Sequence, residues 1–264
     1  MKFKIWQEDV TQPPNSGRRF KMIFKLSSPV RHPFVSMDFR NLDLETWVAL
    51  ITRDGLLCVM EPSIPYGMAE WQYLDRLRVC RVPPRGEENP FKVQFHHDPT
   101  DITHTLFPSW DRKSLSLVVA AKNTVAVYRT DAGCRNFYHA VELGPHGDLV
   151  RDVSWANGSV RGYDVIATAC RDGHVRIFEV YTSVDNAGLQ NARHGRNVES
   201  SNNSNNNNAP TSGIGSALAT RSPHSLHSRQ SGQMSPFKHS FKQVACIDSG
   251  HIDVWQVEFS FAGE

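Results

Sequence analysis

The densest group of potential metal ligands in the chain comprises His96, His97, Asp98, Asp101 and His104. Imidazole and carboxylate groups bind zinc and iron, and a site requires several of them to converge on one ion. The spacing of these five residues matches no helix-borne or knuckle arrangement of zinc ligands. We therefore interpret the segment as a loop between two strands, rich in turn-forming residues. The alternative, a function of a different class, is that these residues bind a metal in a metalloenzyme.

The sequence lacks the common catalytic motifs. It contains no Gly-x-Ser-x-Gly, no P-loop and no Gly-x-Gly-x-x-Gly. Asp38, Asp54, Asp152 and Asp172 are acid–base candidates, but two of them lie in hairpin turns, where aspartate shapes the backbone. We therefore predict no catalytic residue, no bound metal and no cofactor, and expect a protein that is not an enzyme.

Several tryptophans could form a ligand-stacking surface: Trp47, Trp71, Trp110, Trp155 and Trp255. Trp155 and Trp255 fall on the apolar side of alternating stretches. Core packing is therefore the better interpretation for these two.

The elements that position these residues are strands. An alternating run through Val153 and Trp155 is followed by a dense apolar run from Val165 to Cys170. An Asp-Gly pair then precedes a second alternating run that reaches Phe178. Asp-Gly between such runs is a strong hairpin signal, because both positions tolerate positive φ. The stretch from 149 to 180 thus predicts three consecutive strands of one β-propeller blade.

The pattern repeats along the chain. Four similar triplets are predicted to end the first strand of each unit: Met37-Asp38-Phe39, Val93-Gln94-Phe95, Val153-Ser154-Trp155 and Val257-Glu258-Phe259. A four-stranded blade with long loops fits the gaps between them. The sequence predicts an all-β, partial β-propeller of about three complete four-stranded blades plus parts of two others. Residues 1–180 would hold blades, and 237–264 the end of one blade and the first strand, Val254 to Phe259, of the next.

The segment 181–236 between these parts differs in composition. After Tyr181 it has no aromatic residue, and 200–208 consists only of Ser and Asn. Such a stretch cannot bury enough apolar surface to offset its ordering entropy, so we expect a disordered insert within a blade.

The charge of the chain bears on its partners, and its cysteines bear on their redox state. The arginines of the insert exceed its acids by two, which equals the formal net charge of +2 for the whole chain. The remainder is neutral, which gives little support for nucleic-acid binding. The five cysteines are widely spaced and odd in number, as expected for reduced thiols. No apolar run is long enough for a transmembrane helix.

Three stretches resemble WD-repeat proteins. They are 149–155, the run from Ile166 to Phe178, and Gly250-His251 followed by Val254-Trp255-Gln256-Val257. The family's marks are a Gly-His pair, an apolar second strand, an Asp-Gly turn and a third strand that ends in Trp-Asp. The resemblance implies a buried structural network of His146, Thr168 and Asp172. Phe178 replaces the expected Trp and has no N–H to donate.

Within WD-repeat proteins, the chain is most similar to the Sec-thirteen/Seh family of nucleoporins and coat proteins. The Ser/Asn-rich insert resembles that of fungal members. The resemblance implies a six-bladed open propeller completed by a seventh blade that a helical-solenoid nucleoporin donates. The chain holds fewer strands than six blades need, so we expect an incomplete chain.

The resemblance also implies the cellular role. That role is a scaffold in the Y-shaped outer-ring complex of the nuclear pore, at the nuclear envelope, in support of mRNA and protein transport. A second role is implied in the coat-like complex at the vacuole membrane that regulates TOR kinase signalling. The alternatives are a vesicle-coat scaffold of the Sec-thirteen kind and, in a different class, a propeller-fold metalloenzyme.

Overall fold

A computed structural model describes residues 2–42, 45–97, 114–130, 136–157, 162–184 and 237–260. The chain divides into two compact units, one of Met1–Ser183 with Lys238–Glu264 and one of Val184–Phe237. The sheets belong to the first unit. In the described parts every regular element is a strand. The same parts contain no helix long and apolar enough to cross a membrane.

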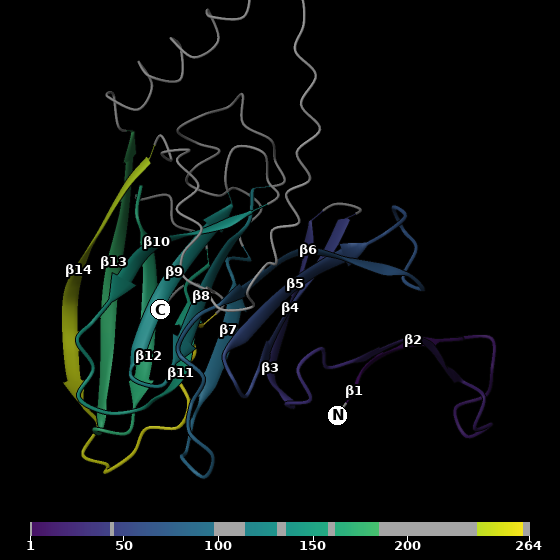
Figure 1. Ribbon diagram of the computed structural model, residues 1–264, viewed down its shortest axis with the longest axis horizontal. Coiled ribbons are helices and arrows are strands. Elements are labelled where there is room, and N and C mark those ends of the chain that lie inside the picture. Colours follow the sequence, from purple (N-terminus) through teal and green to yellow (C-terminus); the bar gives the residue numbers. More distant parts are fainter. Residues whose placement is uncertain are drawn as a thin grey trace, which may run out of the picture. The chain divides into compact units, whose positions relative to one another are not determined.

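The predicted all-β, WD-repeat propeller class is confirmed. Three complete four-stranded antiparallel sheets follow a two-stranded sheet, and the strand order of each follows the chain (Figure 1). The strands are β1 Lys2–Glu8, β2 Phe20–Ser27, β3 Phe34–Leu42, β4 Glu45–Thr52, β5 Leu56–Pro62, β6 Trp71–Arg78, β7 Phe91–Phe95, β8 Ser116–Ala121, β9 Thr124–Thr130, β10 Phe137–Leu143, β11 Val150–Trp155, β12 Asp164–Cys170, β13 His174–Val184 and β14 Phe237–Asp248.

The middle strands of the sheets β3–β6 and β7–β10 are apolar on both faces because each of these sheets packs between two neighbours. Alternate residues of β4 enter different cores. Val48 and Leu50 pack with Phe3 of β1, whereas Ala49 packs with residues of β7 and β8. Val118 of β8 likewise joins the core shared with β11 to β13. Continuous apolar runs are therefore the expected signature of these strands.

The turns between second and third strands differ from the expected Asp-Gly type. Gly55 and Gly173 have φ of 79° and 82°, and each amide donates to the carbonyl three residues earlier. Among the described residues, Asp54 and Asp172 do not join them in the left-handed region. The turns are thus three-residue loops in which glycine alone supplies positive φ. In the turn between β8 and β9 the left-handed residue is Lys122 (φ 59°).

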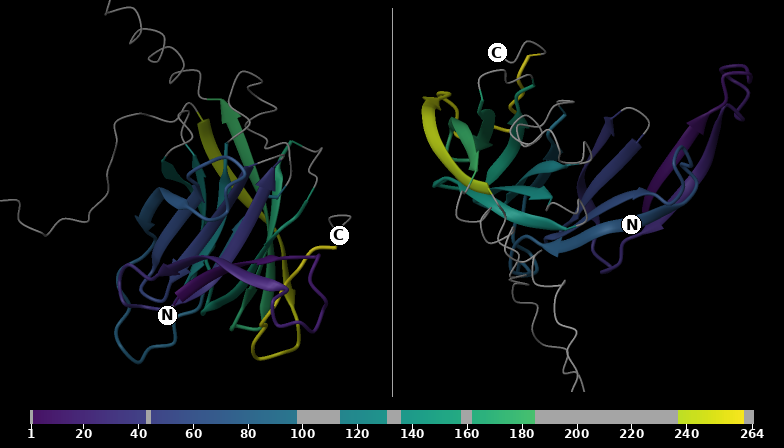
Figure 2. Two further views of the ribbon diagram at one scale, coloured as in Figure 1. Left: turned by 90° about the vertical axis from the view of Figure 1, so that its right-hand side faces the viewer. Right: turned by 90° about the horizontal axis from the view of Figure 1, so that it is seen from above.

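Two strand ends differ from their predictions. β13 runs to Val184, past the boundary expected at 180, and β14 begins at Phe237 beside it (Figure 2). The disorder predicted for the insert falls on 185–236, which lies outside the described residues. Val254 to Phe259 was expected to form a strand, but it joins none of the described sheets.

Candidate functional site

The structure brings together three of the four residues of the predicted network. His146 lies in the loop before β11, and its Nε2 is 3.0 Å from Oγ1 of Thr168 on β12. Both residues are buried. The ring of Phe178 on β13 lies 5.8 Å from the His146 ring, centroid to centroid. A buried histidine, a threonine and an aromatic ring thus meet in the sheet β11–β14.

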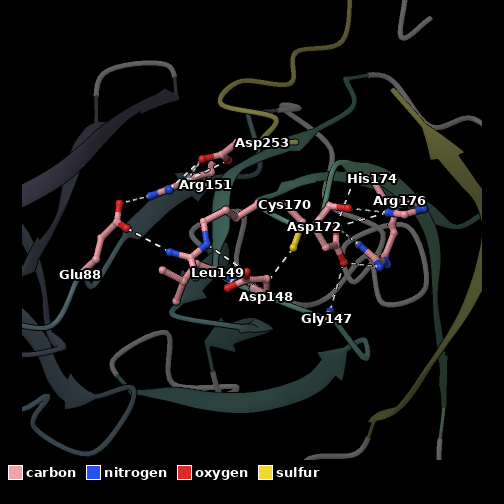
Figure 3. Close-up of polar contacts among 11 residues, drawn as sticks. Glu88, Gly147, Asp148, Leu149, Arg151, Cys170, Asp172, His174, Arg176 and Asp253 are labelled. Atoms are coloured by element: carbon pink, nitrogen blue, oxygen red, sulfur yellow. Dashed lines mark hydrogen bonds and ion pairs between the residues drawn. The ribbon is translucent and has the colours of Figure 1, made fainter. Parts of the chain in front are cut away.

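The fourth residue, Asp172, binds an arginine instead of the histidine (Figure 3). Arg176 donates from both terminal nitrogens, at 2.6 and 3.1 Å, and the amides of His174 and Gly147 donate at 3.1 and 3.2 Å. Burial opposes ionisation of Asp172, but these donors outweigh it and hold the pKa of the carboxyl well below its ordinary value. The aspartate therefore stays charged and anchors the turn.

The histidine is neutral at physiological pH. Burial, followed by the nearby charge of Arg176, lowers the pKa of His146 from 6.5 to about 4. Its Nδ1 has no hydrogen-bond partner within the described residues. Because Phe178 has no N–H, Thr168 receives no indole donor. The network therefore consists of one hydrogen-bonded pair beside a separate Asp172–Arg176 ion pair.

The sheet β3–β6 contains a related arrangement around Asp54. Arg78 donates to Asp54 Oδ2 from both terminal nitrogens at 3.1 Å, and Thr52 Oγ1 donates to Oδ1 at 2.5 Å. Sequence reasoning missed both arginines. Arg176 follows its aspartate by four positions, a spacing that a hairpin could have suggested. Arg78 is 24 positions from Asp54, and no local signal connects them.

Side chains on the first strands join successive sheets. Ser36 Oγ and Asp38 Oδ2 on β3 accept hydrogen bonds from the amides of Val93 and Phe95 on β7, at 3.2 and 2.7 Å. Gln94 Oε1 on β7 accepts from the amide of Trp155 on β11, at 2.7 Å. Each first strand thus offers side-chain acceptors to the backbone of the next.

The same device holds the segment after β14. Asp152 Oδ2 and Ser154 Oγ on β11 accept from the amides of Val257 and Phe259, at 3.2 and 3.4 Å. This segment therefore occupies the position of a further first strand. The signal in the sequence was the polar residue between two apolar ones in each triplet. Its role was missed because the partners are 57 to 105 positions apart.

Comparison with known proteins finds three fungal nucleoporins among the relatives of this chain. It is 36% identical over 198 residues to nucleoporin SEH1 of Chaetomium thermophilum. It is 28% identical over 177 residues to nucleoporin SEH1 of Saccharomyces cerevisiae, and 30% identical over 136 residues to nucleoporin seh1 of Schizosaccharomyces pombe. The chain is thus similar to nucleoporins of the Seh1 type.

The matches cover 65%, 67% and 51% of this chain, and 36%, 47% and 36% of the three relatives. The chain thus spans less than half the length of the curated relatives it matches. No protein-family model matches it.

Two of the solved structures that resemble this chain do so distantly. Sqt1 of Saccharomyces cerevisiae aligns with a TM-score of 0.44 and 9% identity, over 72% of this chain and 48% of its own. The Polycomb Repressive Complex 2 of Chaetomium thermophilum aligns with a TM-score of 0.37 and 17% identity, over 55% and 28%.

The histidine cluster of the chain does not converge where it is described. His96 is buried, and its ring lies 4.9 Å from that of Trp155. His97 Nε2 lies 2.8 Å from Asp38 Oδ2. Asp98, Asp101 and His104 fall outside the described residues. Across the part of the chain that is described, no three His, Cys, Asp or Glu side chains are placed to hold a metal ion.

The tryptophan interpretation is correct for Trp155 and wrong for Trp255. Trp155 is 4% exposed, whereas Trp255 is 67% exposed. Trp255 stacks against Arg151, whose guanidinium carbon lies 4.2 Å from the ring centroid. Alternation predicted burial, but a cation on the preceding first strand covers one face of the ring instead.

Arg151 belongs to a charged cluster in the loops that lead into the first strands. It donates to Asp253 at 2.8 Å and also pairs with Glu88 (Figure 3). Hydrogen bonds from Arg151 to these carboxylates raise the pKa of its guanidinium. Arg171 completes the cluster by binding Asp148 at 2.9 Å and Glu88 at 3.3 Å. The charged groups described above thus bind one another and join loops of successive sheets.

Proposed function

We propose that this protein is a non-catalytic scaffold subunit of the outer ring of the nuclear pore complex, in its Y-shaped assembly. In that position it supports the transport of mRNA and protein between nucleus and cytoplasm. The observation that carries the proposal is the similarity to three fungal chains, each of which is named a nucleoporin.

The chemistry of the described residues supports a scaffold. Asp54 and Asp172, two of the four acid–base candidates of the sequence, are bound by arginines within their own sheets. The acceptors Asp38 and Gln94 hold the next sheet. A general acid or base must instead be free to exchange a proton with a substrate. These side chains stabilise turns within blades and contacts between blades, and the resulting rigid surface is suited to binding proteins.

The proposed partners follow from the family resemblance. A helical-solenoid nucleoporin would donate a seventh blade by strand addition, a recurring mode of peptide recognition. Other outer-ring nucleoporins would bind loops and sheet edges, and nucleic acid would not be a direct ligand. The location would be the nuclear envelope of the nucleus, with the nuclear pore complex as the assembly.

The proposal is tested by affinity capture of the full-length protein, tagged at its own locus, with identification of stoichiometric partners. We expect outer-ring nucleoporins, including one helical solenoid. Recovery of vesicle-coat subunits in their place would assign the Sec-thirteen-like alternative. Co-purification of vacuolar coat-like subunits as well would support the second role in TOR signalling. Stoichiometric zinc or iron in the purified protein would favour the metalloenzyme.

A further inference from the structure

The turn after the second strand begins with a cation in each of the three complete sheets. Arg53 and Arg171 precede the Asp-Gly pairs, and Lys122 opens the shorter turn between β8 and β9. Because the three sheets are repeats of one unit, these residues occupy corresponding places. Three repeated positions thus present positive charge at the same end of their sheets.

All three cations reach the same pair of acidic residues. Arg53 donates from Nη2 to the backbone carbonyl of Glu87 at 3.4 Å, and Lys122 Nζ lies 3.3 Å from Glu87 Oε2. Arg171 Nη1 lies 3.3 Å from Glu88 Oε2. The loop 83–90, which is part of the connection between β6 and β7, therefore places two glutamates among cations from three successive sheets.

The contacts of the loop with Arg53, Lys122 and Arg171 are weak, whereas Glu88 makes a closer contact with Arg151, whose side chain is only 7% exposed. The side chains of Glu87 and Glu88 are 53% and 51% exposed, and those of Lys122 and Arg171 are 31% and 41% exposed. Ion pairs this accessible contribute little to stability, because water and salt screen them. The 3.3–3.4 Å distances are also longer than those of strong charge-assisted hydrogen bonds. On these three cations, carboxylates from another chain can therefore replace the groups of the loop at small cost.

We propose that Arg53, Lys122 and Arg171 form a docking site for an acidic peptide segment of a partner protein, which the loop 83–90 occupies in the free chain. Glu87 and Glu88 act as an internal mimic of that peptide. The inference is independent of the assignment to the nuclear pore, because it rests on contacts within this chain.

The neighbouring charges favour a peptide over a nucleic acid. Arg151 also pairs with Glu88, but its side chain is 7% exposed and is bound by Asp253. It therefore supports the site without being part of its exposed surface. Asp148 binds Arg171 and stays in place when the loop leaves. These two aspartates repel a continuous run of phosphates. A short peptide can place a few carboxylates on the exposed cations and avoid them.

The test measures binding of a fluorescein-labelled oligoglutamate peptide to the 264-residue chain by fluorescence anisotropy at low ionic strength. The combined variant Arg53→Gln, Lys122→Gln and Arg171→Gln should bind about tenfold more weakly, since three exposed ion pairs are lost. The variant Glu87→Gln with Glu88→Gln should bind several-fold more tightly, because the internal competitor has lost its charge.

A matched control removes the same charge elsewhere. Lys21→Gln, Lys25→Gln and Lys242→Gln together should leave peptide affinity within about twofold of the unsubstituted chain, because they lie outside the site. Thermal unfolding of every variant verifies that it is folded.

Three results would overturn the proposal. The first is equal weakening by the control and by the site variant. The second is unchanged peptide affinity in the Glu87→Gln, Glu88→Gln variant, which would mean that the loop only joins the sheets and does not compete with the peptide. The third is tighter binding of labelled oligouridine than of the peptide, lost in the site variant, which would reassign the surface to nucleic acid.

Discussion

Protonation of His146 should make the stability of the sheet β11–β14 depend on pH. Its pKa is about 4 in the folded chain and 6.5 in a solvated reference. Because folding lowers the pKa, the unfolded chain binds the proton more tightly. Stability is therefore full above about pH 6.5 and is lost progressively down to about pH 4. The difference of about 2.5 units gives a loss of about 3 kcal/mol over that range.

The assay compares urea unfolding of the 264-residue chain and of its His146→Gln variant, followed by tryptophan fluorescence, between about pH 7.5 and pH 4. Glutamine can still bond to Thr168 but does not titrate. The original chain should lose about 3 kcal/mol more than the variant over this range. The comparison stops at pH 4 because, toward and below the ordinary pKa of 3.8, the stabilisation that charged Asp172 gives is also lost.

A control substitution, His251→Gln, exchanges a solvent-exposed imidazole and should leave the pH dependence of the original chain in place. Nuclear magnetic resonance of the His146 ring gives a second measurement that does not depend on unfolding. Parallel stability curves for the His146→Gln variant and the original chain, or a ring that titrates near pH 6.5, would refute the reasoning.

Three further predictions concern the turns and the buried ion pair. Gly173→Ala should cost about 2–5 kcal/mol in urea unfolding, because a Cβ would lie 2.3 Å from a backbone oxygen at positive φ. Gly17→Ala, with equal strain but open space, should cost only about 1–2 kcal/mol. Lys122→Gly should stabilise the chain by about 1 kcal/mol, whereas Lys122→Ala should not, since only glycine relieves the left-handed strain. Asp164→Asn should cost about 3–5 kcal/mol, because it breaks a 2.6 Å pair with Arg129 in which both side chains are at least 97% buried. Replacing both Asp164 and Arg129, by Leu and Met respectively, should recover most of the unfolding free energy that Asp164→Asn loses.

The strands could be predicted from the sequence because their signals are local. Alternating and continuous apolar runs report burial on one or two faces of a strand. The alternating run through Val153 and Trp155 forms β11, and the apolar run from Val165 to Cys170 forms β12. The segment 254–259 satisfied the same pattern but forms no ladder. A strand requires a backbone partner, and alternation reports only which side chains are apolar.

The candidate site could be predicted only in part, because its contacts are not local. His146 and Thr168 meet as the family pattern implies. Arg176 was missed as the partner of Asp172 because the family pattern gives that place to histidine, although the four-position spacing in the hairpin is a local signal. Trp255 was expected in the core, but its cover is a cation on another sheet. Contacts between repeats depend on the packing of whole sheets, which no short sequence window contains.

The proposed residence of this protein in the nuclear pore scaffold is tested most directly by fluorescence recovery after photobleaching of the full-length protein, tagged at its own locus in living cells. We expect a punctate nuclear rim that recovers slowly, because a scaffold subunit is held by several partners at once. Diffuse fluorescence, a vesicular pattern, or rapid recovery at the rim would contradict it.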